Sequence, residues 1–106
     1  MKSIEALKET EIKRIVDEAV KIIRSYLSQK DYTILFFGSW ATIKALPTSD
    51  IDIAILGKNR VDDFILIKIK EEIENLPTLR SIDIVDLNTF DERSREKILR
   101  YAEVID

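Results

Sequence analysis

The chain has 106 residues with a net charge of −3, and it contains no Cys and no His. We therefore expect one domain spanning residues 1–106, without a disulfide scaffold, a Cys nucleophile, a thiolate zinc site or an imidazole metal ligand. The acidic net charge does not fit a protein that binds duplex DNA. No apolar run approaches the roughly 20 residues of a membrane span, and the start MKSIEALKET lacks the apolar core of a signal peptide. We therefore expect a cytoplasmic protein.

The first half of the chain predicts one long helix and two strands. In residues 4–29 apolar side chains recur at three- and four-residue steps between charged ones, which is typical of an amphipathic helix. The run 33–37 is β-branched and aromatic and predicts a buried strand. Residues 39–46 follow as a short helical turn. Residues 50–56 alternate carboxylates with isoleucines, and this period of two predicts a second strand.

The second half predicts a helix, a third strand and a final helix. Residues 61–76 step by four and three, although the inner piece 65–69 also alternates as a strand would. Residues 81–87 predict the third strand, and Thr89 with Glu92 reads as a capping box before the last helix. This order predicts an α/β or α+β domain with a small mixed sheet flanked by helices. The residues expected to face inward near the end of the chain are Phe90, Ile98, Leu99, Ala102 and Ile105.

Carboxylates on the predicted strands are the candidate metal ligands. Asp50 and Asp52 lie two apart in a strand and so share one face, where a hard cation such as Mg²⁺ or Mn²⁺ would offset their repulsion. By itself this pair is also compatible with a solvated sheet face. Asp83 in the next strand makes a third carboxylate, and we prefer it to Asp86 because residues three apart in a strand face opposite sides.

A Gly-Ser pair lies where the first predicted strand ends. Gly38 lets a ligand approach the backbone closely, and Ser39 adds a hydroxyl donor near amides that favour an anion such as phosphate. An ordinary turn at a strand end explains the same two residues. Combined with the three carboxylates, however, the pair completes the parts needed for metal-assisted phosphoryl chemistry.

Gly38-Ser39, a spacer of ten residues and then Asp50-x-Asp52 resemble the signature of the polymerase-beta-type nucleotidyltransferases. The chain is similar to the minimal nucleotidyltransferases, short proteins of about this length, and residues 82–105 add to the resemblance. The resemblance implies a polymerase-beta-like fold, ATP or another nucleoside triphosphate as substrate, and Mg²⁺ or Mn²⁺ as cofactor. It also implies a small helical HEPN-type protein partner, for which such proteins act as antitoxins.

The resemblance implies roles for individual residues. Asp50 and Asp52 match the carboxylates that bind the divalent cations, and Asp83 matches the third, which also helps to deprotonate the attacking hydroxyl. Gly38 and Ser39 match the residues that hold the triphosphate. Ser49 matches the serine that precedes the first aspartate and orients it by hydrogen bonding.

The segment after Gly-Ser departs from the family pattern. Where the family carries Arg, a small residue, Arg and Gly, this chain has Trp40, Ala41, Thr42 and Ile43, and the nearest cation is Lys44. A lysine is a point charge on phosphate whereas an arginine binds bidentately, so we expect weak nucleotide binding by the isolated chain.

Two functions of different classes follow from the sequence. The first is a magnesium-dependent nucleotidyltransferase that transfers a nucleoside monophosphate, AMP from ATP, to a hydroxyl of a partner or substrate. The alternative is a catalytically weak interaction protein that binds and neutralises a helical partner, which the lost arginines favour. Trp40 and the outer face of the first helix are candidate contact surfaces for that partner or for a homo-oligomer. An unrelated small α/β domain remains a third reading.

Overall fold

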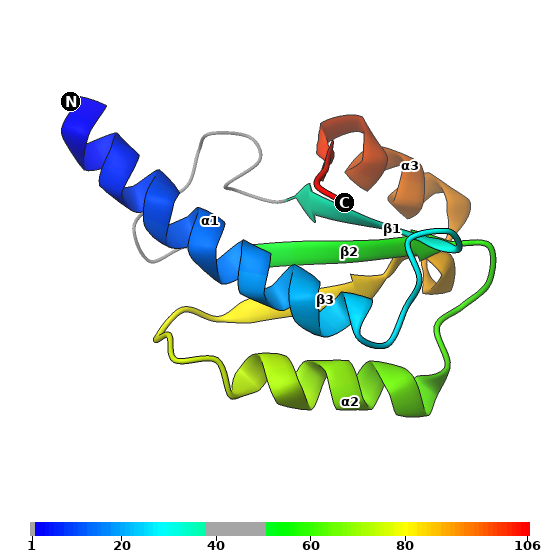
Figure 1. Cartoon of the computed structure of the whole chain (residues 1–106). Helices are drawn as coiled ribbons and strands as arrows, with labels where there is room; N and C mark the ends of the chain where they lie inside the picture. Colours follow the sequence, from blue (N-terminus) through cyan, green and yellow to red (C-terminus); the bar gives the residue numbers. More distant parts are fainter. Residues whose placement is uncertain (1, 38–50) are drawn as a thin grey trace.

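The structure is a computed structural model that describes the backbone of residues 2–37 and 51–106, and the side chains in these ranges from residue 11 onward (Figure 1). Residues 39–46, for which a helical turn is expected, lie outside the described residues. None of the helices in the described ranges has the length and apolar character of a membrane span. The elements follow in the order α1 (Lys2–Arg24), β1 (Tyr32–Phe37), β2 (Ile51–Gly57), α2 (Asp63–Glu74), β3 (Ile82–Asp86), a 3₁₀ turn η1 (Leu87–Thr89), α3 (Glu92–Tyr101) and β4 (Glu103–Val104).

The strands form one mixed sheet in the order β3-β2-β1-β4, which confirms the predicted α+β class. β1 pairs antiparallel with both β2 and β4, whereas β2 and β3 run parallel. The parallel pair requires a crossover, and α2 provides it. Consequently β2 and β3 begin at the same end of the sheet, the end at which β1 finishes.

Two helices cover one face of the sheet. Figure 1 shows α1 crossing in front of β2, with α2 alongside. The isoleucines of the alternating strand point to this side, and Ile51, Ile53 and Ile55 have no exposed surface. Each such burial stabilises the fold by about 1.5–3 kcal/mol. The buried members of this α1/α2-side core are Ile12, Ile15, Val16, Ala19, Ile23, Leu27, Ile34, Ile51, Ile53, Ile55, Val61, Ile69, Ile73 and Ile84.

The opposite face carries a smaller core under α3. Its buried members are Leu35, Ala54 and Leu87, one residue each from β1, β2 and η1. The inward positions predicted for the last helix include Ile98 and Leu99, and both pack against this α3-side core. On the same face, Asp83 of β3 is exposed and Asp52 of β2 is half-buried.

Helix α1 and helix α2 differ from expectation mainly at their ends. Helix α1 ends at Arg24 rather than near residue 29, and the Ser25 hydroxyl then donates to the Ile22 carbonyl at 2.6 Å. Residues 65–69, which alternate as a strand would, lie inside helix α2. The Asp62 side chain caps that helix by accepting the Phe64 N–H at 3.1 Å, which favours the helical conformation locally.

The end of the chain contradicts two predictions. The capping box is wrong, because Asp91 is the N-cap of α3 and accepts the Ser94 N–H at 2.7 Å. Thr89 lies in η1 instead, where its hydroxyl donates to the Asp86 carbonyl. The last helix also stops at Tyr101, and the chain continues as the unexpected strand β4. As a result Ile105 packs against the α1/α2-side core, on the other face from the one that α3 covers.

Candidate functional site

Two of the three predicted carboxylates lie side by side at the end of the sheet where β2 and β3 begin. In the parallel pairing of these strands, Asp52 is the register partner of Asp83. Adjacent strands are about 4.8 Å apart, and partners in register point to the same face. Asp52 is half-buried and Asp83 is exposed. The backbone thus holds two carboxylates next to each other on the face that α3 partly covers.

Apolar residues border this carboxylate pair on two sides. Phe37, the last residue of β1, is the register partner of Asp52, so an aromatic ring flanks the pair on the β1 side. Two positions along the strands on the same face lie Ala54 and Val85, which belong to or pack against the α3-side core. On its outer side the pair meets solvent, because β3 is an edge strand. Asp83 is accordingly exposed, so the pair is accessible at this edge strand.

Two adjacent carboxylates of this kind suit a hard divalent cation. Side by side they repel each other, and a cation bound to their oxygens offsets the repulsion. Within residues 2–37 and 51–106 no group of three acidic side chains forms a metal site. The third predicted ligand, Asp50, lies outside the described residues. The donor chemistry of Asp52 and Asp83 fits Mg²⁺ or Mn²⁺, with Asp50 as an expected additional ligand.

Asp86, the competing candidate, has a structural role in the fold. It is 2% exposed and lies on the opposite side of β3 from Asp83, next to the α1/α2-side core. Its carboxylate accepts the Val61 N–H at 2.7 Å and the Asn88 N–H at 3.0 Å. These bonds tie the end of β3 to the segment before α2 and to η1, so the carboxylate is already occupied by the backbone.

The residues expected to bind the nucleotide belong to the chain segment 38–50. Gly38, Ser39, Lys44 and Ser49 lie outside the described residues, as does Trp40. Their roles remain predictions from the resemblance. Phe37 and Ile51, the described residues on either side of this segment, both lie at the end of the sheet that carries the carboxylates.

Sequence reasoning did not single out the connection between α2 and β3, which reaches the same end of the sheet. The Ser81 carbonyl accepts the Ile51 N–H at 2.9 Å, directly before the rung that holds Asp52 and Asp83. Arg80 is mostly buried, with its side chain 15% exposed, and pairs with Glu11 of α1. No local pattern links residues 69 positions apart, so the sequence offered no signal for this contact.

A protein-family comparison identifies most of the chain. The family described as "Polymerase beta, Nucleotidyltransferase" matches residues 21–105, which include both described carboxylates of the site. The chain is also 32% identical over 93 residues to a protein of Haemophilus influenzae (strain ATCC 51907 / DSM 11121 / KW20 / Rd) described as a probable protein adenylyltransferase, MntA. That alignment covers 86% of this chain and 82% of the relative.

Solved structures with a similar fold include two toxin–antitoxin complexes. One is a toxin–antitoxin with AMP-PNP, matched with a TM-score of 0.65 and 22% identity over 83% of this chain and 69% of that chain. The other is a tri-AMPylated HEPN toxin of Shewanella oneidensis in complex with an MNT antitoxin. It is matched with a TM-score of 0.65 and 19% identity, over 88% of this chain and 70% of that chain. At these identities the likeness concerns the fold.

Proposed function

The chain belongs to the polymerase-beta nucleotidyltransferase family, as one of its minimal nucleotidyltransferases, and from this premise we propose that it transfers AMP from ATP to a hydroxyl of a HEPN-type protein partner. Magnesium or manganese is the proposed cofactor. The observation that carries the proposal is the pairing of Asp52 with Asp83 on one open face of the sheet. With Asp50 they form the proposed metal-binding and catalytic set.

In the proposed reaction the acceptor oxygen attacks the α-phosphorus of ATP. A new phosphorus–oxygen bond forms to the acceptor, the bond between the α-phosphorus and the bridging oxygen breaks, and pyrophosphate leaves with that oxygen. A bound divalent cation supplies neutralisation of the charge that develops on the phosphoryl oxygens. Asp83, which is exposed on the β3 side, accepts the proton of the hydroxyl. Gly38, Ser39 and Lys44 hold the triphosphate, and Ser49 orients Asp50 by hydrogen bonding.

The names of the similar proteins support this choice of nucleotide, acceptor and partner. The relative that shares 32% identity is described as a protein adenylyltransferase, which favours AMP as the transferred group and a protein as the acceptor. One similar complex contains AMP-PNP, and another contains an AMPylated HEPN toxin bound to its MNT antitoxin. By the same likeness we infer that this chain acts as the antitoxin of such a pair.

Metal binding is the first test of the proposal. Calorimetric titration with Mn²⁺ should give binding to the wild-type protein and a clearly weaker response for Asp52→Asn, because the substitution removes one charged ligand. A matched control is Asp63→Asn at the start of α2, where the side chain is 83% exposed and lies after the end of β2, whereas Asp52 lies at the start of that strand. Equal binding by wild type and Asp52→Asn would reject the site.

Transfer of labelled AMP to the cognate partner is the second test. We expect negligible transfer by the isolated chain and measurable transfer with the partner and Mg²⁺, reduced by at least about 100-fold in Asp83→Ala. Unchanged labelling by that variant would remove Asp83 from the reaction. The same substitution should not weaken the complex between the two proteins, which gel filtration measures.

The departures from the family pattern support a second candidate function. Trp40 and Thr42 stand where the family carries arginines, which weakens the case for tight triphosphate binding. The chain would then neutralise its helical partner by binding alone. A tight complex in which no AMP is transferred under any condition, with Mg²⁺ and ATP present, would favour this interaction protein over the enzyme.

A further inference from the structure

The carboxylate pair lies at the end of a strand ladder that has little support of its own. β3 is an edge strand, and Asp52 with Asp83 is the second rung from the start of its pairing with β2, after Ile51 with Ile82. Ladder ends at sheet edges open locally at much lower free energy than the core. Separation of the two strands there would move the carboxylates apart, so the geometry of the pair depends on what holds the beginning of β3.

Among the described residues, a backbone bond between Ser81 and Ile51 holds the beginning of β3 to β2 ahead of the paired rungs. The Ser81 carbonyl accepts the Ile51 N–H at 2.9 Å. Ser81 is the last residue of the connection between α2 and β3, so the position of its carbonyl depends on that connection. Within it, the Thr78 N–H donates to the Leu76 carbonyl at 2.8 Å and the Arg80 N–H donates to the Thr78 hydroxyl at 3.1 Å, which makes the connection compact.

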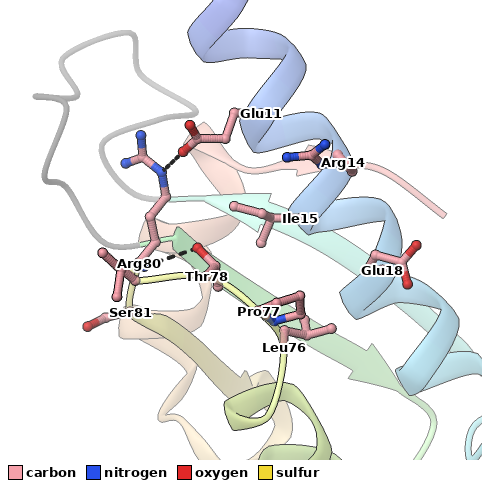
Figure 2. Close-up of a pocket in the computed structure, with 10 residues that line it drawn as sticks. Glu11, Arg14, Ile15, Glu18, Leu76, Pro77, Thr78, Arg80 and Ser81 are labelled. Carbon is pink, nitrogen blue, oxygen red and sulfur yellow. Dashed lines mark hydrogen bonds and ion pairs between the residues drawn. The ribbon is translucent and has the colours of Figure 1, made fainter.

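An ion pair fastens this connection to α1. The Arg80 Nε atom lies 2.5 Å from Glu11 Oε1, and the arginine side chain is 15% exposed against 47% for the glutamate. Figure 2 shows Arg80 reaching from the connection toward Glu11 on the helix. Below the pair, a groove of about 910 Å³ separates α1 from the connection and is bordered by Ile15, Leu76 and Pro77. The ion pair therefore bridges one end of an otherwise open groove.

We propose that the Glu11–Arg80 ion pair is a positioning clamp that keeps Asp52 and Asp83 in register for cation binding. The inference rests on the proposed function, since it concerns the metal site of that function. Arg80 pairs with Glu11 of α1, and α1 packs on the face of the sheet opposite to the carboxylates. Arg80 is thus a positioning residue that acts through the backbone of Ser81.

The direction in which Arg80→Gln changes the Mn²⁺ affinity distinguishes the clamp from a purely electrostatic effect of Arg80. Arg80→Gln removes a positive charge from the end of the sheet that carries two carboxylates. Through charge alone this change would strengthen cation binding, because a cation at the site would meet less repulsion. Loss of the clamp has the opposite effect, since loosened carboxylates bind a cation less well.

The test is Mn²⁺ titration of wild type, Glu11→Gln, Arg80→Gln and the double variant. We expect the dissociation constant to rise about tenfold in each single variant, and the double variant to fall well short of the product of the two effects because both variants remove the Glu11–Arg80 contact. In the metal-free protein, amide exchange at Ile51 should accelerate in the same variants, since its N–H bond to Ser81 opens more often. Arg80→Lys keeps the positive charge and can still pair with Glu11. It should therefore raise the Mn²⁺ dissociation constant and the Ile51 exchange rate less than Arg80→Gln does.

The chain offers a matched control in a second ion pair. Arg24 Nε lies 2.7 Å from Asp106 Oδ2, and this arginine side chain is also 15% exposed. The pair ties the end of α1 to Asp106, two residues after the end of β4, on the β1 side of the sheet. Arg24→Gln should therefore lower the melting temperature but leave both the Mn²⁺ affinity and the Ile51 exchange rate at wild-type values.

The outcomes distinguish the clamp from the proposed function. Unchanged or tighter Mn²⁺ binding by Arg80→Gln overturns the clamp, as does an equal loss of affinity in Arg24→Gln. If wild type binds no Mn²⁺, the proposed metal site fails, and the Ile51 exchange rate still decides the clamp. An exchange rate that is the same in wild type, Glu11→Gln and Arg80→Gln rejects it.

Discussion

Asp83 and Asp86 are three residues apart in one strand, and replacing each by alanine should have opposite consequences. Asp86 is 2% exposed and accepts two backbone N–H groups, from Val61 at 2.7 Å and from Asn88 at 3.0 Å. Asp83 is exposed, and within the described residues the structure gives it no hydrogen bond or ion pair. We expect Asp86→Ala to destabilise the fold and Asp83→Ala to leave it intact while abolishing AMP transfer.

The magnitude follows from the two bonds of Asp86. A hydrogen bond to a charged group contributes about 1.5–3 kcal/mol, and alanine removes both and leaves the N–H of Val61 without its acceptor. The energy recovered by no longer burying a charge offsets part of this loss, so we expect a net destabilisation of about 3 kcal/mol. For a domain of this size, roughly 4–8 °C per kcal/mol converts this value to a fall in melting temperature of about 12–24 °C. Asp83→Ala should stay within about 0.5 kcal/mol of wild type.

Thermal unfolding followed by circular dichroism measures both values, and Asp86→Asn provides an intermediate case. The amide of asparagine keeps one acceptor oxygen but presents an NH₂ group to the second N–H, so about half of the loss should remain. A wild-type melting temperature for Asp86→Ala would refute the assignment of Asp86 to the fold. A large fall for Asp83→Ala would refute the assignment of Asp83 to the site.

Three further predictions concern single positions. The pKa of Asp91 is lowered by hydrogen bonds from the Ser94 side chain and backbone, so its stabilising effect is present above the ordinary value of 3.8 and is lost as the pH falls through the lower folded value. Asp91→Asn should therefore reduce the fall in melting temperature between neutral pH and about pH 3, and an unchanged fall would contradict this. Gly57→Ala would place a Cβ against the Tyr32 ring and 2.8 Å from the Asp31 carbonyl oxygen, which should lower the free energy of unfolding by about 1–3 kcal/mol. Urea denaturation measures this value, and a wild-type midpoint would disprove the close contact. Metal-free Asp83→Asn should melt at or above the wild-type temperature because its repulsion with Asp52 is relieved, and a clear fall would give Asp83 a structural role.

Local patterns predicted the elements where one residue period dominates. The alternation of carboxylates and isoleucines in β2 correctly assigned Ile53 to a core face and Asp52 to the other, because side chains in a strand point to alternate sides. The same pattern was ambiguous at residues 65–69, where isoleucines fit both periods. The cap of α2 by Asp62 and the longer spacing from Val61 to Ile73 favour the helix there, so the wider window decides.

Local patterns failed where a contact from elsewhere in the chain decides the conformation. β4 has only two residues, and no period is visible in so short a run. It forms because the open edge of β1 accepts it, with Ile105 N–H bonding to the Ile34 carbonyl at 2.9 Å. The capping box at Thr89 failed for a similar reason, since its hydroxyl bonds to the Asp86 carbonyl at the end of β3.

In the candidate site, too, some features follow from local sequence patterns and others from contacts between distant parts of the chain. The sequence by itself determined which residue types are available, that Asp52 faces away from the neighbouring isoleucines of its strand and that Asp83 lies on the other side of its strand from Asp86, because these follow from chain periodicity alone. Only the tertiary structure decided that Asp52 and Asp83 are register partners, since register depends on how α2 packs and on where Ser81 meets Ile51. The Glu11–Arg80 contact spans 69 residues and likewise exists only once α1 has docked on the sheet. Periodicity acts between neighbours in sequence, whereas the distance between two carboxylates on different strands is set by the packing of the whole domain.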